Sequence, residues 1–326
     1  MIYRIAGQPI VVEAQDSWAA QVIERLFSGW YLAPDSESGP SAVEIVIGST
    51  TAPPEIPRDW PQFEIAGEGT CFTDGTTSYI DIEGSIIALG RPGHSAVQVW
   101  TNGKLDLQSS ALTRVVTYAL STALRHRGLF ELHSGAVAEP ESGRGVLIIG
   151  PSGSGKSTLT VQLATAGWSF LTDDVLLLSS QDEQVKAWPI RRCFAITSGT
   201  FEASDFLRSR ISLDYRENRH DDKKQFAPHD VFNSGFREQC VPRGLFFTQL
   251  SGADQSNVLQ LSAGETMARL IRMSPWSCYD RATAKDHLAT LAALAKQSVG
   301  FSLNAGKDLL DPQTSANLIA RHLQLV

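Results

Sequence analysis

Residues 146–157, which read VLIIGPSGSGKS, constrain the fold of this chain more than any other stretch. The apolar run from Val146 to Ile149 has the length of a buried strand, and residues 158–164 have the composition of a helix start. Between them, Gly150 to Ser157 fits the pattern G-x-x-x-x-G-K-[S/T]. A strand, a glycine-rich loop and a helix in this order are what a phosphate-binding loop requires. We therefore expect an α/β fold around this unit.

Each residue type in the loop has a physical task. Glycines such as Gly153 and Gly155 let the backbone turn tightly and bring its N–H groups against phosphate oxygens. The helix N-terminus adds unpaired N–H groups and a partial positive charge. Lys156 supplies a full charge for the β- and γ-phosphates, and the Ser157 hydroxyl is placed to bind Mg²⁺. The motif predicts a magnesium–nucleotide site made by Gly150, Ser152, Gly153, Ser154, Gly155, Lys156, Ser157 and Thr158.

Composition narrows the class of protein. The chain has 326 residues, of which 42% are hydrophobic and 19% charged, as in a globular protein with a core. A net charge of −7 argues against bulk nucleic-acid binding. The four cysteines are far apart and form no C-x-x-C pair, which disfavours zinc and redox motifs. No signal peptide and no apolar run of about 18 residues is present, so we expect a cytoplasmic protein without a membrane span.

Two domains are expected from the length and the pattern. Residues 1–105 contain several strand-like segments, among them 43–47 and 96–100, and one helix after Asp16; this predicts a strand-rich α+β domain without a catalytic motif. Its role is expected to be substrate recognition, oligomer contacts or a structural cap. A broad apolar face predicts a helix over 105–125, at the start of the second domain, 106–326.

An acidic pair follows a short apolar strand soon after the loop. Ser169-Phe170-Leu171 leads into Thr172-Asp173-Asp174. Two carboxylates at a strand end beside a phosphate-binding loop suit Mg²⁺ binding and base chemistry; the structural alternative is a solvated turn. Before the loop, Phe130 to Ala138 reads as a strand that carries His133.

A basic cluster lies in the irregular stretch 187–244. Its members are Arg208, Arg210, Arg216, Arg219, Lys223 and Lys224. Arginine clusters bind phosphate or acidic peptide, and a solvated loop is the alternative.

The surroundings of the loop separate the classes of P-loop protein. Transporter ATPases place their second acidic motif far downstream, after an LSGGQ-like helix, and this chain has no such segment. A short gap between loop lysine and acidic pair occurs in small-metabolite kinases and in the HPr kinase/phosphorylase family with its structural cousins, the phosphoenolpyruvate carboxykinases. In metabolite kinases the loop lies on the first strand, whereas here the strand with His133 precedes it.

The order of Leu132 to Ala138, the P-loop and Phe170 to Asp174 resembles the HPr kinase catalytic domain. Lys224-Gln225-Phe226-Ala227-Pro228 and 242–247 resemble later segments of the same family, so the resemblance covers roughly residues 125–305. It implies an HPr-kinase/PEP-carboxykinase-like core that binds ATP and Mg²⁺ and phosphorylates a serine hydroxyl of a peptide or protein.

The resemblance also implies roles for individual residues. Asp173 would be the general base, Asp174 and Ser157 would bind Mg²⁺, and His133 would lie beside the γ-phosphate or the metal. Because Asp173 and Asp174 are neighbours on one turn, their roles could be exchanged. Lys224 is the member of the basic cluster that the resemblance marks as functional, while Lys156 serves both binding and catalysis.

The chain also departs from the bifunctional enzymes of this family. Residues 188–194 lack the glycine-rich stretch linked to dephosphorylation, which counts against phosphorylase activity and against HPr as the substrate. The chain looks more like HPr-kinase-related proteins found with peptide-modification clusters, including those that phosphorylate a lasso peptide at its C-terminal serine. Relatives are often oligomeric, which makes a homo-oligomer an expectation. A metabolite kinase and a nucleotide-binding regulatory protein are the alternatives.

Overall fold

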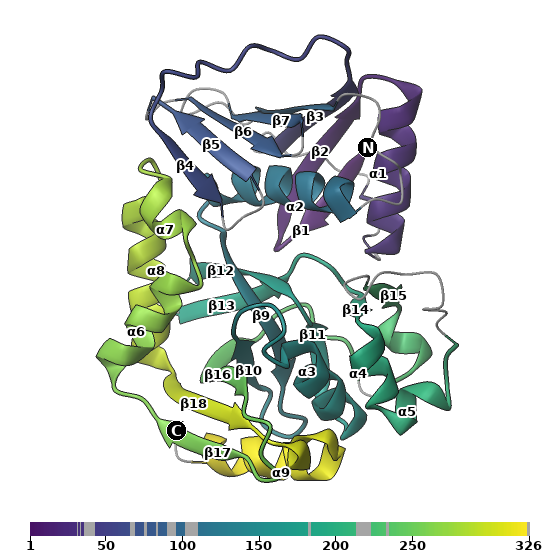
Figure 1. The fold of residues 1–326 in the computed structure, drawn as a ribbon, viewed down its shortest axis with the longest axis vertical. Coiled ribbons are helices and arrows are strands. Elements are labelled where there is room, and N and C mark those ends of the chain that lie inside the picture. Colours follow the sequence, from purple (N-terminus) through teal and green to yellow (C-terminus); the bar gives the residue numbers. More distant parts are fainter. Residues whose placement is uncertain are drawn as a thin grey trace. The chain divides into compact units, whose positions relative to one another are not determined.

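The computed structural model describes residues 1–30, 32, 34–35, 43–65, 69–74, 77–82, 84–89, 96–101, 110–181, 184–212, 223–232 and 235–324. The fold is mixed α/β (Figure 1). Its contacts divide the chain into two compact units. The first unit comprises Met1–Phe130 and Pro275–His287, and the second comprises Glu131–Ser274 and Leu288–Val326.

The first unit is built on an eight-stranded sheet in the order β1-β2-β3-β8-β7-β6-β5-β4. β2 is parallel to β3 and β3 is parallel to β8, whereas the remaining neighbours are antiparallel. The strands are β1 (Ile2–Ile5), β2 (Gln8–Ala14), β3 (Val43–Ser49), β4 (Gln62–Ile65), β5 (Gly69–Thr73), β6 (Ser78–Ile82), β7 (Ser85–Leu89) and β8 (Ala96–Thr101).

Helices pack on this sheet. α1 (Ser17–Gly29) contacts β2 and β3, and α2 (Ser110–Arg125) contacts β3, β7 and β8. The Asp16 carboxylate accepts a hydrogen bond from the Ala19 backbone N–H at 2.8 Å and so caps the helix, which begins after Asp16 as the sequence predicts. α7 (Trp276–Tyr279) belongs to this unit as well.

The division of the chain differs from the boundary expected at residue 105. Helix α2 belongs to the first unit because its apolar face packs on the sheet of that unit. Residues 105–109 of the predicted helix lie outside the described residues. The segment 275–287 also belongs to the first unit, although it comes much later in the sequence.

In the described residues, the second unit has an eight-stranded sheet: seven strands follow the order β13-β12-β9-β10-β16-β18-β17, and the eighth, β11, pairs with β9. β10, β16 and β18 are parallel, and β9 is antiparallel to β10. Its strands are β9 (Phe130–Ala138), β10 (Arg144–Ile149), β11 (Ser169–Thr172), β12 (Val175–Gln181), β13 (Gln184–Pro189), β16 (Val241–Leu250), β17 (Asn257–Gln260) and β18 (Val299–Ala305); β14 (Phe194–Ile196) and β15 (Lys224–Phe226) form a separate pair.

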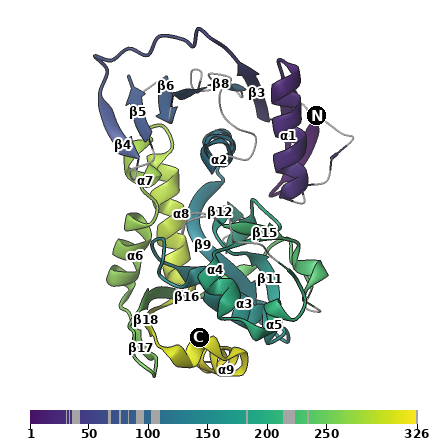
Figure 2. The ribbon, with the colours of Figure 1, turned by 45° about the vertical axis from the view of Figure 1, so that its right-hand side comes forward.

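Helices cover both faces of this sheet (Figure 2). Val146 and Ile148 of β10 pack toward helices α3 and α9, whereas Leu147 and Ile149 pack toward α6 and α8, as the alternation of side chains along a strand requires. The helices are α3 (Lys156–Thr165), α4 (Ser198–Glu202), α5 (Asp205–Arg208), α6 (Ala263–Arg272), α8 (Ala284–Gln297) and α9 (Pro312–Leu323), with 3₁₀ turns η1 (Pro228–Asp230) and η2 (Lys307–Leu310).

Candidate nucleotide-binding and catalytic site

The glycine-rich loop connects β10 to α3 in the second unit, so the predicted strand, loop and helix are confirmed. Gly153 and Gly155 have φ angles of +76° and +91°. This left-handed conformation is strained for residues with a β-carbon, and it lets the chain turn back into the first turn of α3. Gly155 is the residue that precedes the helix, and the first helical N–H groups follow it.

Lys156 is the first residue of α3 and is buried. Its ammonium donates hydrogen bonds to the carbonyls of Gly150 at 2.8 Å and Pro151 at 3.0 Å. Burial lowers the pKa of Lys156 to about 8, against the opposing charge of Asp174. The loop carbonyls therefore hold the lysine in place with hydrogen bonds that a triphosphate could replace.

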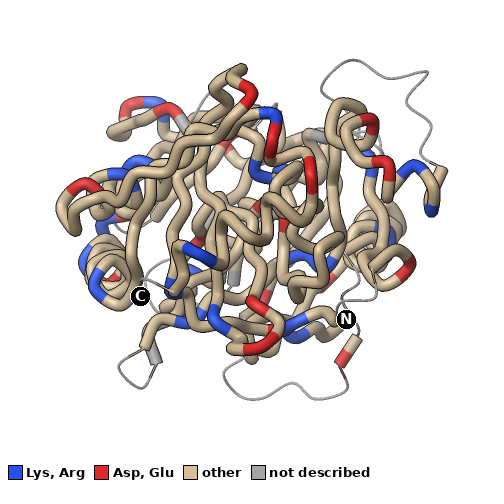
Figure 3. Tube along the Cα trace, turned by 90° about the horizontal axis from the view of Figure 1, so that it is seen from below, with Lys and Arg blue, Asp and Glu red and all other residues tan. Residues whose placement is uncertain are grey.

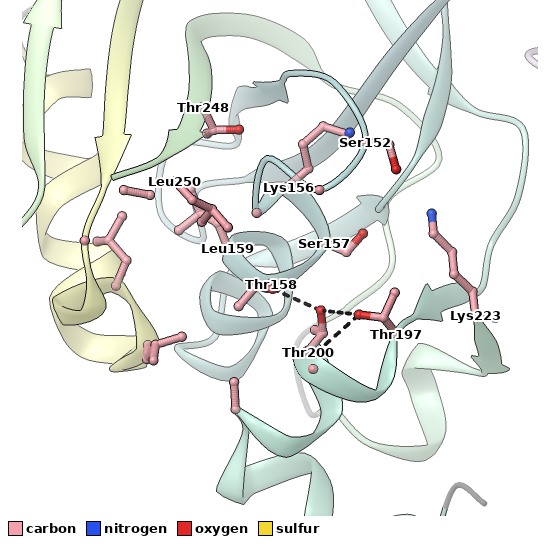
Figure 4. Close-up of a pocket in the computed structure, with 18 of the residues that line it drawn as sticks. Ser152, Lys156, Ser157, Thr158, Leu159, Thr197, Thr200, Lys223, Thr248 and Leu250 are labelled. Atoms are coloured by element: carbon pink, nitrogen blue, oxygen red, sulfur yellow. Dashed lines mark hydrogen bonds between the residues drawn. The ribbon is translucent and has the colours of Figure 1, made fainter. Parts of the chain in front are cut away.

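A cavity of about 360 Å³ opens beside the loop (Figure 4). One part of its wall is polar and comes from the loop, the start of α3 and two side chains from elsewhere in the unit: Ser152, Gly153, Gly155, Lys156, Ser157, Thr158, His133 and Lys223. Another part is apolar and includes Leu159, Leu250, Leu309 and Leu310. A mostly apolar pocket with a few convergent polar groups is typical of a small-molecule site.

Two of the predicted loop residues, Gly150 and Ser154, do not line the cavity. The Gly150 carbonyl accepts from Lys156, and the Ser154 hydroxyl lies 3.2 Å from the Thr248 hydroxyl. A β-carbon at residue 150 would lie 2.5 Å from the Ser154 Oγ, so only glycine fits there.

A chain of hydroxyls links the loop helix to α4. The Thr158 Oγ1 lies 3.0 Å from the Thr200 Oγ1, which is 3.4 Å from the Thr197 Oγ1 (Figure 4). Thr197 also caps α4 by accepting from the Thr200 backbone N–H. Thr197 and Thr200 both line the cavity, and no sequence motif marks either of them.

Asp174 is held by three side chains with cationic or protonatable groups. Its carboxylate lies 2.8 Å from the His133 Nε2, 2.5 Å from a terminal nitrogen of Arg191 and 3.4 Å from the Lys223 ammonium. Burial alone would raise its pKa, but the hydrogen bond from His133 and the charges of Arg191 and Lys223 outweigh burial and hold the pKa of Asp174 well below its usual range. Asp174 is therefore ionised at neutral pH.

Asp173 differs from its neighbour in exposure and in partners. The side chain is fully buried, and its Oδ2 accepts from the Ala195 backbone N–H at 3.0 Å. Its Oδ1 has no hydrogen-bond partner among the described residues. Burial and the negative charge of Asp174 raise the pKa of Asp173 to about 6. Two adjacent carboxylates thus have widely separated proton affinities, which is the pattern that assigns different chemical roles.

The lysine and the arginine that contact Asp174 are not the residues that the sequence predicted. Lys223 lines the cavity and contacts Asp174, whereas Lys224, the predicted residue, pairs with Ile196 at the start of β15 and does not line the cavity. Arg191 was not predicted: it follows β13 and is buried against Asp174. Arg216 and Arg219 of the basic cluster lie outside the described residues.

The donors present suit Mg²⁺ that is held partly by phosphate. Within the described ranges, no group of three or more His, Cys, Asp and Glu side chains is arranged to hold a metal. Mg²⁺ commonly uses one or two protein oxygens together with substrate phosphates and water. The Ser157 hydroxyl makes no hydrogen bond to any described side chain and lines the cavity, and the Asp174 carboxylate contacts two residues that line it. The Ser157 and Asp174 oxygens therefore suit a Mg²⁺ ion whose other ligands are phosphate and water.

No helix within the described part of the chain is both long and apolar enough to cross a membrane.

Comparisons with known proteins give distant similarity to solved structures alone. No model of a protein family matches the sequence, and no curated protein matches it. Among solved structures, the HPr(Ser) kinase/phosphatase from Coxiella burnetii is similar to this chain with 13% sequence identity, over 60% of this chain and 91% of that one, at a TM-score of 0.35.

Proposed function

We propose that the chain is an ATP- and Mg²⁺-dependent kinase that transfers the γ-phosphate to a serine hydroxyl of a peptide or protein. One observation carries this proposal: His133 and Lys223 line the cavity beside the phosphate-binding loop and both contact Asp174, whose neighbour is Asp173. A binding protein needs only the loop, whereas a phosphoryl-transfer enzyme also needs a base and charge-neutralising groups.

Lys156, Ser157 and the loop backbone would hold the triphosphate. Lys156 would exchange the carbonyls of Gly150 and Pro151 for phosphate oxygens, because its ammonium already lies at the cavity wall. When bound through Ser157 and Asp174, Mg²⁺ would neutralise phosphate charge. Lys223, which also lines the cavity, would add a further positive charge.

Asp173 would accept the proton of the attacking hydroxyl. A general base works best when its pKa lies near the operating pH, and the pKa of Asp173 is raised to about 6. Asp173 is then mostly ionised at pH 7, and its Oδ1 has no competing donor among the described residues. Neither aspartate lines the cavity, so the mechanism also requires His133 and Lys223 to move aside when the acceptor binds.

The motif order supports a peptide or protein acceptor. The strand with His133, the P-loop and the strand before Asp173 occur in the order of the HPr kinase family. The departure at residues 188–194 favours a substrate other than HPr, such as a peptide with a C-terminal serine. The apolar wall of the cavity, which includes Leu159 and Leu250, supports binding of the nucleoside part of ATP.

Mass spectrometry after incubation with Mg·ATP tests this proposal. The acceptors would be peptides ending in serine, HPr and a pool of hydroxylated metabolites, with the Lys156→Ala protein as the inactive control. We expect one added phosphate on a peptide serine in the wild-type reaction only. Phosphate on a metabolite would instead establish a metabolite kinase, and ATP binding without any labelled acceptor would contradict the kinase assignment.

A further inference from the structure

A second concave site lies in the second unit, at the opposite end of β10 from the nucleotide cavity. It has a volume of about 340 Å³, and four of its lining residues are cations: Arg144, Lys186, Arg237 and Arg243. Ser142 and Gln239 add polar groups to the lining. We call it the basic groove.

Tight backbone packing builds the basic groove. Gly143 has a φ of +68°, and a β-carbon there would lie 2.8 Å from a terminal nitrogen of Arg237, so glycine lets the arginine lie over the turn between β9 and β10. Cys240 and Ala187 exchange two backbone hydrogen bonds of 2.9 and 3.0 Å. These bonds fix the segment that carries Arg237 beside β13, which carries Lys186.

Most of the positive charge of the basic groove has no carboxylate partner among the described residues. Arg144 donates to the Glu139 carboxylate at 3.3 Å and to the Leu323 carbonyl at 3.0 Å, while Arg243 donates to the Gln297 carbonyl at 3.3 Å. Lys186 and Arg237 form no ion pair with any carboxylate in the described ranges. The nearby Glu238 is instead paired with Arg192.

Four cations in one groove repel one another, and an anion between them would relieve that repulsion. The concentration is local, because the chain as a whole has a net charge of −7 and its basic and acidic residues are interspersed along the trace (Figure 3). The basic groove is therefore not the extended basic surface that nucleic acid requires.

We propose that the basic groove binds a small organic polyanion that carries at least two phosphate or carboxylate groups. Its volume falls in the range of small-ligand sites, and arginine side chains offer paired donors that match the geometry of both anionic groups. β10 has six residues, so at ~3.3 Å per residue the groove and the phosphate-binding loop are separated by roughly 17 Å. The groove is thus a second site, and it does not depend on the proposed kinase function.

Isothermal titration calorimetry of the full chain with inorganic pyrophosphate, and separately with citrate, tests this proposal. The Lys156→Ala protein removes the phosphate-binding lysine of the loop and so isolates the groove. In that background we expect binding of at least one probe to persist. Arg237→Gln and Lys186→Gln should each weaken it roughly tenfold, because each removes one charge-assisted contact. Arg272→Gln, an exposed arginine of α6 outside the groove, is the matched control and should leave affinity unchanged.

The two probes separate the sources of the anion. Binding of pyrophosphate alone would support a phosphorylated ligand, and equal binding of citrate would support polyanions in general. The proposal is overturned if neither probe binds in the Lys156→Ala background, or if Arg237→Gln and Lys186→Gln bind as tightly as Arg272→Gln. Circular dichroism of the variants would confirm that each one is folded.

Discussion

Each of the two units holds a partly buried aspartate that contacts an arginine and a histidine. In the first unit, Asp280 accepts from the Arg125 Nε at 2.7 Å and lies 3.5 Å from the His126 Nε2. In the second unit, Asp174 is held in the same way by Arg191 and His133. In both places the hydrogen bond of the histidine and the charge of the arginine outweigh burial and lower the pKa of the carboxyl well below its usual range.

The surroundings of the two clusters differ. The Arg125 guanidinium lies 4.2 Å above the Trp276 ring, and the adjoining cavity has a volume of only about 10 Å³, which is about one water. The cluster around Asp174 borders a cavity of about 360 Å³ and includes a second carboxyl, Asp173, whose pKa is raised to about 6. An ion pair alone therefore does not mark a functional site; the open cavity and a group that titrates near neutral pH do.

The largest contrast between the clusters should appear in turnover. Removing a cation that stabilises the transferred phosphoryl group costs about 10³–10⁵ in rate. We expect Lys156→Ala to lower phosphoryl transfer by at least about 10³-fold and to weaken ATP binding. Initial rates and ATP affinity, measured beside Arg125→Met protein at a temperature where both are folded, would check this. Near-normal transfer by Lys156→Ala would contradict the assignment of the site.

Arg125→Met should act on stability instead. It leaves the Asp280 carboxylate, which is 13% exposed, without its main partner. Breaking a buried pair from one side costs about 3–5 kcal/mol. We expect a loss of about 3 kcal/mol in the free energy of unfolding, with the ATP affinity of the folded protein unchanged. Urea denaturation measures this, and the exposed Arg127→Met is the matched control. Equal stability of the two variants would show that the pair between Arg125 and Asp280 does not stabilise the fold.

The first unit should also respond to acid through His287. This side chain is fully buried and stacks on Phe130 with the ring centroids 4.6 Å apart. Burial, with a smaller contribution from Arg125, lowers its pKa from 6.5 to about 4. Because the unfolded state takes up the proton first, stability is retained above pH 6.5 and is lost as the pH falls toward 4.

When the pH is lowered from 7.5 to 4.5, His287 alone should reduce the free energy of unfolding by about 2–3 kcal/mol. Denaturation of the wild type and of His287→Gln at both pH values isolates the effect as the difference between the two proteins. The same pH dependence in both would show that His287 is not its source.

The smallest expected effect distinguishes two neighbouring lysines. Lys223 lines the nucleotide cavity and is partly exposed, so Lys223→Met should weaken Mg·ATP binding about three- to tenfold, as expected for one screened charge. Lys224→Met should have no such effect. Titration with a fluorescent ATP analogue would measure both, and the reverse order of effects would restore Lys224 as the functional residue.

The sequence predicts the parts of the site that are local in the chain. The strand, loop and helix around Lys156 and the strand end at Asp173 are each set by a few consecutive residues, and the structure has them as predicted. Lys223 and Lys224 are adjacent, and which of them faces the cavity depends on how β15 pairs with β14. That pairing joins segments about 30 residues apart, so no local pattern indicates it.

Tertiary packing also decides features that no local sequence pattern indicates. Arg191 looks like an ordinary polar residue after a strand, and only its burial against Asp174 gives it a place in the site. The domain boundary depends on where the apolar face of α2 packs. The segment 275–287 joins the first unit through contacts such as the pair between Asp280 and Arg125, which are 155 residues apart.

Asp173→Asn, assayed for Mg·ATP binding and for phosphoryl transfer on the same preparation, tests the central claim most directly. The substitution keeps the shape of the side chain and removes its ability to accept a proton. We expect ATP binding within about twofold of the wild type and transfer reduced by about 10²–10⁴, the usual contribution of a general base. Unchanged transfer with intact binding would contradict the claim that the carboxylate pair beside the phosphate-binding loop performs the chemistry.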